Sequence, residues 1–149
     1  MLDFEIVQLK QKHLAQSDNW IPQDVSKILL KKPNTTLQHT DDPLSWAGVI
    51  NDEVLCIASV SLNKDHVGFL ECIVKPNMSN QGIGTQMIEY VLRQRAVDAL
   101  IHLHTLVAQD NIGAQKILEK QGFTRIGFGA DNQIEFARHK YQSSNNLHL

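Results

Sequence analysis

A strand that runs into a glycine-containing loop and then a helix is the feature that most constrains the fold of this chain. An apolar run at residues 69–74 is followed by Pro76 and then by Gly82 and Gly84. Apolar residues next recur at helical spacing over residues 83–92. Glycines at such a turn let backbone N–H groups approach a ligand, and a helix start adds a partial positive charge of about +0.5. The segment therefore predicts a site for a phosphate or pyrophosphate.

Two well-known phosphate-binding loops do not match this segment. A P-loop ends in Gly-Lys-Ser/Thr, whereas the stretch Gly82–Thr85 contains no lysine. The Rossmann fingerprint requires a third glycine three residues after the second, and Met87 stands at that position. The Rossmann loop also belongs to the first βαβ unit of its domain, whereas this loop lies past the middle of the chain.

Composition narrows the class of protein. The 149 residues are 42% hydrophobic and 20% charged, which is typical of one globular domain. The net charge of −2 gives no indication of a nucleic-acid surface, and no apolar run approaches the ~20 residues that cross a bilayer. Cys56 and Cys72 each lie in an apolar strand pattern without metal-ligand spacing, as expected for buried thiols in a reducing compartment. The N-terminus shows no secretory signal. We therefore expect a cytoplasmic protein without nucleic-acid or membrane partners.

Two motifs carry a resemblance to a known family. Residues 79–84, Ser-Asn-Gln-Gly-Ile-Gly, resemble the Arg/Gln-x-x-Gly-x-Gly/Ala motif of the GNAT superfamily of acyl-CoA-dependent N-acetyltransferases. Residues 111–123 resemble its Asn-x-x-Ala-x-x-Leu-Tyr-x-x-x-Gly-Phe block. Both motifs occur in order within residues 67–126, which is more specific than either alone. The sequence departs from the pattern at Ser79, where the family has Arg or Gln, and at Leu118, where it has Tyr. In many members that Tyr protonates the leaving CoA thiolate.

The resemblance implies an α/β (α+β) fold. Its core would be a mixed, mostly antiparallel sheet of six to seven strands with flanking helices and a splayed central strand pair. We expect a single domain over residues 1–142 and a disordered tail over 143–149. Periodicity alone indicates only mixed α and β, with one or two helices over residues 14–30 and one from the glycine loop to about Ala96. The expected strands cover residues 4–9, 46–50, 54–60, 67–74, 100–107, 123–126 and 134–138.

The resemblance also implies how acetyl-CoA, the cosubstrate, would be held. Backbone N–H groups of the glycine loop would bind the pyrophosphate. The end of the preceding strand would pair with the pantetheine arm, and an N–H near Val74 would face the thioester oxygen as an oxyanion donor. Asn111 would contact the pantetheine. Lys75, Lys116 and Lys120 are either cations that offset the missing charge at position 79 or ordinary solvated surface lysines. The residues expected to bind acetyl-CoA are Ile73, Val74, Gln81, Gly82, Ile83, Gly84, Thr85 and Asn111.

Glu71 and His104 are the candidate catalytic residues. A carboxylate in a central strand is costly unless it is paired or at an opening, and burial suits it to act as a base near neutral pH. Its alternative roles are a structural partner for a histidine, or simple exposure near a strand end. His102 and His104 share one face of their strand, so one would act as base or relay, or both are polar residues on a half-covered face. Trp20 and Trp46 are interpreted as packed core.

We therefore expect an N-acetyltransferase that moves the acetyl group of acetyl-CoA to a primary amine by direct attack in a ternary complex. The acceptor would be a small molecule or a peptide, and the resemblance leaves a homodimer open. The alternative function is a non-catalytic acyl-CoA-binding sensor or subunit, which Ser79 and Leu118 favour. A third hypothesis, a structural interaction protein without ligand, must explain the glycines by turn geometry alone.

Overall fold

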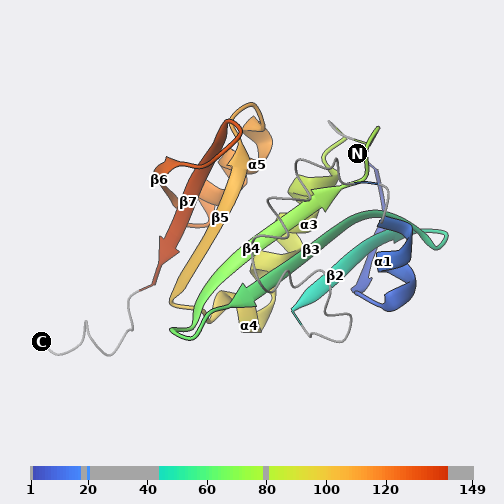
Figure 1. Cartoon of the computed structure of the whole chain (residues 1–149), viewed down its shortest axis with the longest axis horizontal. Coiled ribbons are helices and arrows are strands. Elements are labelled where there is room, and N and C mark those ends of the chain that lie inside the picture. The colour runs from blue at the N-terminus through green and yellow to red at the C-terminus, as the bar shows by residue number, and fades with distance from the viewer. Residues whose placement is uncertain (1, 18–19, 21–43, 79–80, 141–149) are drawn as a thin grey trace, which may run out of the picture.

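The computed structural model describes residues 2–17, 20, 44–78 and 81–140. Within these ranges seven strands form one sheet (Figure 1). The strands are β1 (Glu5–Gln8), β2 (Ser45–Ile50), β3 (Glu53–Leu62), β4 (Val67–Val74), β5 (His102–Ala108), β6 (Thr124–Phe128) and β7 (Gln133–His139). The helices are α1 (Gln11–Ser17), α3 (Ile83–Arg93), α4 (Arg95–Asp98) and α5 (Ile112–Lys120).

The sheet is mixed and mostly antiparallel, as expected. Its spatial order is β1-β2-β3-β4-β5-β7-β6. Among the described strands, only β4 and β5 pair in parallel, because α3 and α4 form the crossover between them. The prediction of a single domain over residues 1–142 stays a prediction, and the predicted tail at 143–149 lies outside the described residues.

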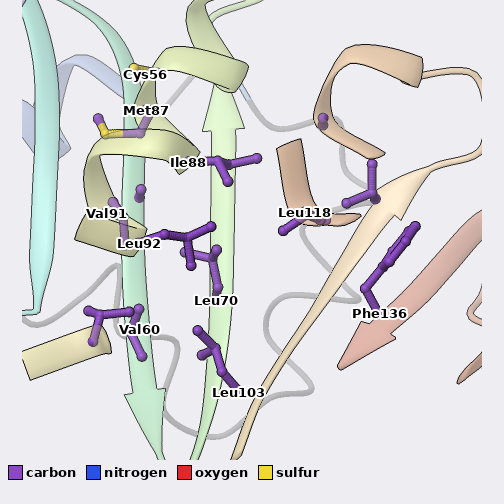
Figure 2. Close-up of a cluster of buried hydrophobic side chains, with 14 of the residues drawn as sticks. Cys56, Val60, Leu70, Met87, Ile88, Val91, Leu92, Leu103, Leu118 and Phe136 are labelled. Atoms are coloured by element: carbon purple, nitrogen blue, oxygen red, sulfur yellow. The ribbon is translucent and has the colours of Figure 1, made fainter. Parts of the chain in front are cut away.

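Helices cover the two faces of the sheet unequally. α3 and α5 lie on one face, called here the α3 face, and α1 lies on the other, the α1 face, over the hairpin of β2 and β3 (Figure 1). The main core fills the α3 face and includes Leu70, Met87, Leu103 and Phe136 (Figure 2). Trp46 belongs to this core, and Trp20 belongs to a smaller cluster on the α1 face, so the interpretation of both tryptophans as packed core is confirmed.

Turn chemistry explains where the elements change direction. The hairpin of β2 and β3 turns at Asn51 and Asp52, whose φ angles of 49° and 67° are typical of a tight two-residue turn. α5 begins at Asn111, whose side-chain oxygen accepts a hydrogen bond from the Ala114 N–H at 3.1 Å.

The predicted helix boundaries are wrong at two places. The helix after the glycine loop ends at Arg93 rather than near Ala96, because Gln94 adopts an extended conformation (φ −69°, ψ 134°). The Gln94 amide donates to the Tyr90 carbonyl at 3.0 Å and so caps the last turn. The first helix begins at Gln11, three residues before the predicted start, and most of its predicted extension lies outside the described residues.

The start of α1 is closed by a buried histidine. The Lys10 N–H donates to His13 Nδ1 at 2.8 Å, which satisfies one of the free donors at this helix terminus. His13 is only 4% exposed. Burial lowers the pKa of His13, and the neighbouring Lys12 lowers it further. The neutral imidazole is therefore the form that stabilises the fold.

Replacement of His13 by glutamine should remove a pH dependence of stability. Glutamine at this position can still accept the Lys10 N–H, as in a capping box, but does not titrate. Because the pKa of His13 is lowered on folding, its contribution is present above the unfolded pKa of about 6.5 and is lost as pH falls through the folded pKa. Urea unfolding at pH 7.5 and pH 5 should show wild type losing more stability than H13Q. Equal losses would contradict this role.

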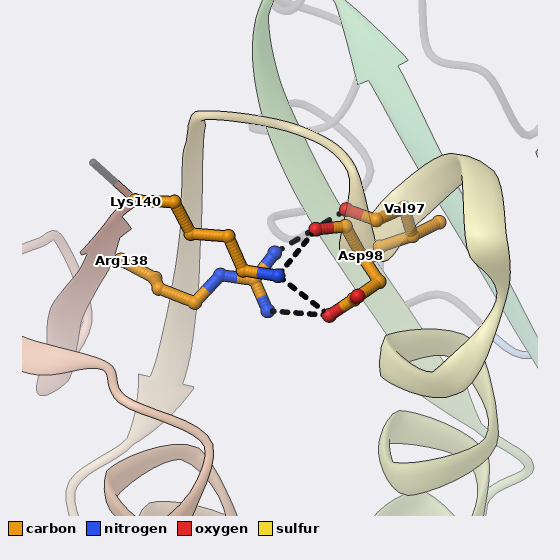
Figure 3. Close-up of polar contacts among 4 residues, drawn as sticks. All are labelled: Val97, Asp98, Arg138 and Lys140. Atoms are coloured by element: carbon orange, nitrogen blue, oxygen red, sulfur yellow. Dashed lines mark hydrogen bonds and ion pairs between the residues drawn. The ribbon is translucent and has the colours of Figure 1, made fainter. Parts of the chain in front are cut away.

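A polar network ties α4 to β7 (Figure 3). Arg138 is 4% exposed, and its Nη2 donates to the Val97 carbonyl at 3.3 Å. Lys140 Nζ binds Asp98 Oδ1 at 2.7 Å, and Arg138 Nη1 lies 3.9 Å from the same oxygen. The Arg138 guanidinium also lies over the Phe123 ring at 5.4 Å. The network fixes the end of the crossover between β4 and β5.

Asp98→Asn should weaken this network by a small, acid-sensitive amount. The hydrogen bond from Lys140 lowers the pKa of Asp98, so its contribution is present above the ordinary carboxyl pKa of about 3.9 and is lost as pH falls through the lowered value. The side chain is 59% exposed, so we expect a loss within about 1 kcal/mol at pH 7. Denaturant unfolding at pH 7 and pH 3 tests this, and a difference that grew at pH 3 would contradict it.

Candidate active site

The two central strands separate at one end. β4 and β5 pair from Val67↔His102 to Leu70↔Thr105, and no further pair joins them within the described residues. Beyond this point β4 continues to Val74 and β5 continues to Ala108. The two ribbons diverge toward the start of α3 in Figure 1. This confirms the expected splayed strand pair.

Backbone groups of β4 face the space between the separated strands. The Lys75 N–H donates to the Leu55 carbonyl of β3 at 2.8 Å. Successive N–H groups of a strand point to opposite edges, so the Val74 N–H is directed toward β5. Because the pairing with β5 has already stopped, this N–H lies where a ligand between the strands would meet it.

The glycine loop supplies backbone donors beside the same space. Gly82 caps α3 in the left-handed conformation (φ 77°, ψ 8°), which favours glycine. A Cβ built on Gly82 meets no described atom within 4 Å, so its backbone borders open space. Hydrogen bonding in α3 begins with the Gln86 N–H donating to the Gly82 carbonyl at 3.0 Å. The N–H groups of residues 83–85 come before that bond and are the donors that a helix leaves for an anion.

Close packing brings the starts of α3 and α5 to the end of β4. A Cβ on Gly84 would lie 3.2 Å from Val74 Cγ2, so the absence of a side chain lets α3 approach the strand. A Cβ on Gly113 would lie 3.3 Å from Thr85 Oγ1, which places the two helix starts side by side. Asn111 Oδ1 is occupied by the cap of α5, which leaves its amide nitrogen as the group available to a ligand. The Ile83 side chain is buried in the core, so only its backbone faces this site.

Glu71 lies where the paired part of β4 ends. It follows Leu70, whose side chain belongs to the core on the α3 face, so Glu71 points to the α1 face. Its side chain is 8% exposed, which excludes simple exposure near a strand end. The residue opposite on β3 is Ser59, which is also buried. Glu71 is therefore a buried carboxylate beside the gap between the strands.

His104 lies on the same face of the sheet as Glu71. It is registered with Phe69 of β4, two residues before Glu71. His104 Nδ1 lies 3.1 Å from Glu135 Oε2 of β7, and His102 Nδ1 lies 2.6 Å from His139 Nδ1. The sequence analysis missed Glu135 and His139, because their proximity depends on the antiparallel register of β5 with β7, which no local pattern encodes.

Other candidate groups are excluded by their surroundings. Burial raises the pKa of the Cys72 thiol to about 12, and burial together with Cys72 raises that of Cys56 further. Neither thiol supplies a nucleophilic thiolate near neutral pH. Tyr90 meets Trp46 edge-on at 6.5 Å on the α3 face, away from Glu71. Lys75 pairs with Glu53 rather than standing free for a phosphate.

Leu118 occupies the position of the family's tyrosine and is fully buried. It lies in the main core on the α3 face, as Figure 2 shows. The position therefore contributes packing and no proton donor. Within the residues that the structure describes, no group of three or more His, Cys, Asp or Glu could hold a metal ion. None of the described helices is long and apolar enough to span a bilayer.

A cavity of about 450 Å³ opens at the end of β5. The Gln109 N–H donates to the Asn132 carbonyl at 2.9 Å, which joins the loop before α5 to the turn between β6 and β7. The cavity lies between these two loops and contains two carboxylates. Its lining residues are Ala108, Gln109, Asp110, Asp131 and Asn132.

Comparison with solved structures finds the same fold. The diaminobutyrate acetyltransferase EctA from Paenibacillus lautus, solved with L-2,4-diaminobutyric acid and coenzyme A, is 14% identical with a TM-score of 0.66, covering 93% of this chain and 96% of that one. The ribosomal-protein-S18-alanine N-acetyltransferase from Escherichia coli is 16% identical with a TM-score of 0.65. The match covers 99% of this chain and 100% of that one. The PaiA N-acetyltransferase from Thermoplasma acidophilum, solved with coenzyme A, is 11% identical with a TM-score of 0.61. The match covers 93% of this chain and 100% of that one.

Sequence comparison shows the family. A search of curated proteins finds no match. The family model described as the acetyltransferase (GNAT) family matches residues 13–123, which is well over half of the chain. This range contains the separated strands, the glycine loop and α5. The chain is therefore an enzyme of the GNAT acetyltransferase family, whose members bind coenzyme A or acetyl-CoA.

Proposed function

We propose that this enzyme transfers the acetyl group of acetyl-CoA to a primary amine by direct attack in a ternary complex. The observation that carries the proposal is the separation of β4 and β5 beside the glycine loop, with Glu71 and His104 on the adjoining face. Acetyl-CoA would supply a thioester, in which the C–S bond breaks as the new C–N bond forms. The absence of an ionised thiol near neutral pH supports direct attack over an acyl-cysteine intermediate.

The protein's part in binding acetyl-CoA would be chiefly main-chain. The N–H groups of Gln81–Thr85 would bind the pyrophosphate, which fits the left-handed Gly82 and the open space beside it. Backbone groups of Ile73 and Val74 would hold the pantetheine arm, and the Val74 N–H would donate to the thioester oxygen. Asn111 would add its amide nitrogen.

Glu71 and His104 would prepare the acceptor. An alkylammonium cannot attack a carbonyl until it loses a proton, and both side chains lie on the face from which an acceptor would approach the separated strands. The buried carboxylate of Glu71 would hold the ammonium in place, and a base beside it would take the proton. This arrangement requires no metal ion.

The loss of the family's tyrosine is compatible with catalysis. A CoA thiol, with a pKa near the ~8.5 of cysteine, leaves tolerably well as a thiolate. General acid catalysis contributes about 10²–10⁴-fold to a rate, and the loss of rate expected here lies in the lower part of that range. Leu118 is fully buried and has no proton to donate, so the leaving thiolate would take its proton from water. The rival function, a non-catalytic acyl-CoA-binding subunit, is favoured by the same residue. The acceptor class, a homodimer and a cytoplasmic location stay predictions.

The test is a thiol-release screen with purified protein and acetyl-CoA. The acceptors would represent four classes: a polyamine (spermidine), an amino acid (L-lysine), an aminoglycoside (kanamycin) and a tripeptide with a free N-terminal alanine. Amine-dependent release of CoA, with an acetylated product of matching mass, is the expected result. If the protein binds acetyl-CoA but none of the four amines causes release of CoA, the non-catalytic subunit is favoured. If the protein neither binds acetyl-CoA nor releases CoA, an acyl-CoA function is contradicted.

A further inference from the structure

Four titratable side chains from β5 and β7 gather on the α1 face of the sheet. In the antiparallel register His104 stands opposite Ala137, so Glu135 and His139 are its two diagonal neighbours. The His104 and His139 rings meet edge-on with centroids 5.8 Å apart. His102 stands directly opposite His139, with ring centroids 4.8 Å apart. Two members of this cluster, His102 and His104, were singled out from the sequence, and Glu135 and His139 were not.

The contact between His104 and Glu135 fixes which imidazole nitrogen carries the proton. A carboxylate accepts hydrogen bonds, so the 3.1 Å contact with Glu135 Oε2 requires a proton on His104 Nδ1. In the neutral imidazole, Nε2 is then the unprotonated nitrogen. Nε2 has no hydrogen-bond partner among the described residues. The two side chains are 23% and 34% exposed, so this is a site partly shielded from water rather than a surface ion pair.

We propose that Glu135 is a positioning residue that holds His104 as the base for the acceptor ammonium. The inference rests on the proposed acetyl transfer. Glu135 accepts the Nδ1–H bond and thereby presents the His104 Nε2 lone pair toward the acceptor. The ammonium N–H bond breaks, its electron pair stays on the amine nitrogen that attacks the thioester, and the proton goes to Nε2. The resulting imidazolium is stabilised by the Glu135 carboxylate.

The charges around His104 favour this role. On the α1 face, Glu71 of β4 and Glu135 of β7 supply carboxyl groups, and His102 of β5 and His139 of β7 supply imidazoles that contact each other. None of the described residues of β4, β5 and β7 that point to this face is Lys or Arg. The 2.6 Å contact between the Nδ1 atoms of His102 and His139 requires a proton on one of them. The face that His104 shares therefore carries two carboxyl side chains and, from these three strands, no Lys or Arg among the described residues.

The first test reads the tautomer of His104 directly and needs no acceptor. Long-range proton–nitrogen NMR of the full chain at pH 8 reports which ring nitrogen carries the proton. We expect the Nδ1–H tautomer of His104 in wild type and in Glu119→Gln. In Glu135→Gln we expect this tautomer to be lost or to be mixed with the Nε2–H tautomer. Glu119 is a matched control because it is an exposed glutamate on α5. An Nε2–H tautomer in wild type would overturn the inference.

The second test is the pH–rate profile with the best acceptor of the four-amine screen. Glu135→Gln should lower the plateau of kcat about 10²-fold and move the acid limb to lower pH, since a neutral amide no longer stabilises the imidazolium. His104→Gln should lose the acid limb, and Glu119→Gln should match wild type. A Glu135→Gln plateau and acid limb both equal to those of wild type would overturn the inference alone. Absence of transfer by wild type would instead overturn the proposed function.

Discussion

Gly82→Val should abolish the stabilisation of this protein by CoA and acetyl-CoA. A ligand at 100 times its Kd stabilises wild type by about 2.7 kcal/mol. Gly82 has φ 77°, where a β-branched side chain costs about 1–3 kcal/mol, so valine must move the backbone that carries the donors of residues 83–85. The built Cβ meets no described atom within 4 Å, so the change strains the loop without a clash in the core. Thermal-shift titration with both ligands measures the effect.

Gly127→Val is the matched control for this substitution. Gly127 lies in β6, far along the sheet from the loop, and a Cβ there also meets no described atom within 4 Å. Its φ is not positive. The control should keep the full shift with CoA, whereas the folded Gly82→Val protein should show none. A full shift in Gly82→Val would mean that the glycine loop does not bind the pyrophosphate.

Glu71→Gln should lower kcat by about 10²-fold or more while leaving the affinity for acetyl-CoA unchanged. Glutamine keeps the shape of this buried side chain but removes the charge that would hold the acceptor ammonium. The deficit should shrink as pH rises toward the ~10.4 of an alkylamine, because more acceptor is then neutral in solution. Steady-state thiol release between pH 6 and pH 10 measures both effects.

Glu89→Gln is the control for this change, because Glu89 forms an exposed ion pair with Arg93 on α3 at 3.4 Å. It should match wild type at every pH. A Glu71→Gln enzyme within about threefold of wild type across the range would remove Glu71 from the catalytic machinery and leave His104 as the remaining candidate.

Local patterns in the sequence predicted the parts of the fold that local chemistry controls. The apolar run of β4 and the helix that begins after the glycine loop each follow from a few neighbouring residues. The break at Gln94 was missed, because the apolar spacing continues through Val97 and the interruption depends on a side-chain cap of the last turn. The spacing of apolar residues does not reveal that a side-chain cap ends the helix at this point.

The site residues that the sequence did not reveal depend on contacts between distant segments of the chain. Glu135 reaches His104 only through the register of β5 with β7, which joins residues 31 positions apart. Glu71 stood out because it is a carboxylate in an apolar strand, and its burial is confirmed. The effect of Leu118 could not be judged from the motif, because only the fold shows that its side chain faces the core.

Direct acetyl transfer is measured by a single-turnover reaction with isotope-labelled acetyl-CoA and the best amine of the screen, followed by mass spectrometry. We predict that the label appears on the amine in equal amount to the free CoA thiol released. We also predict that neither Cys56 nor Cys72 carries the label when the amine is omitted, because burial keeps both thiols protonated. Label retained on acetyl-CoA with every amine, or label on a cysteine of the protein, would contradict direct transfer.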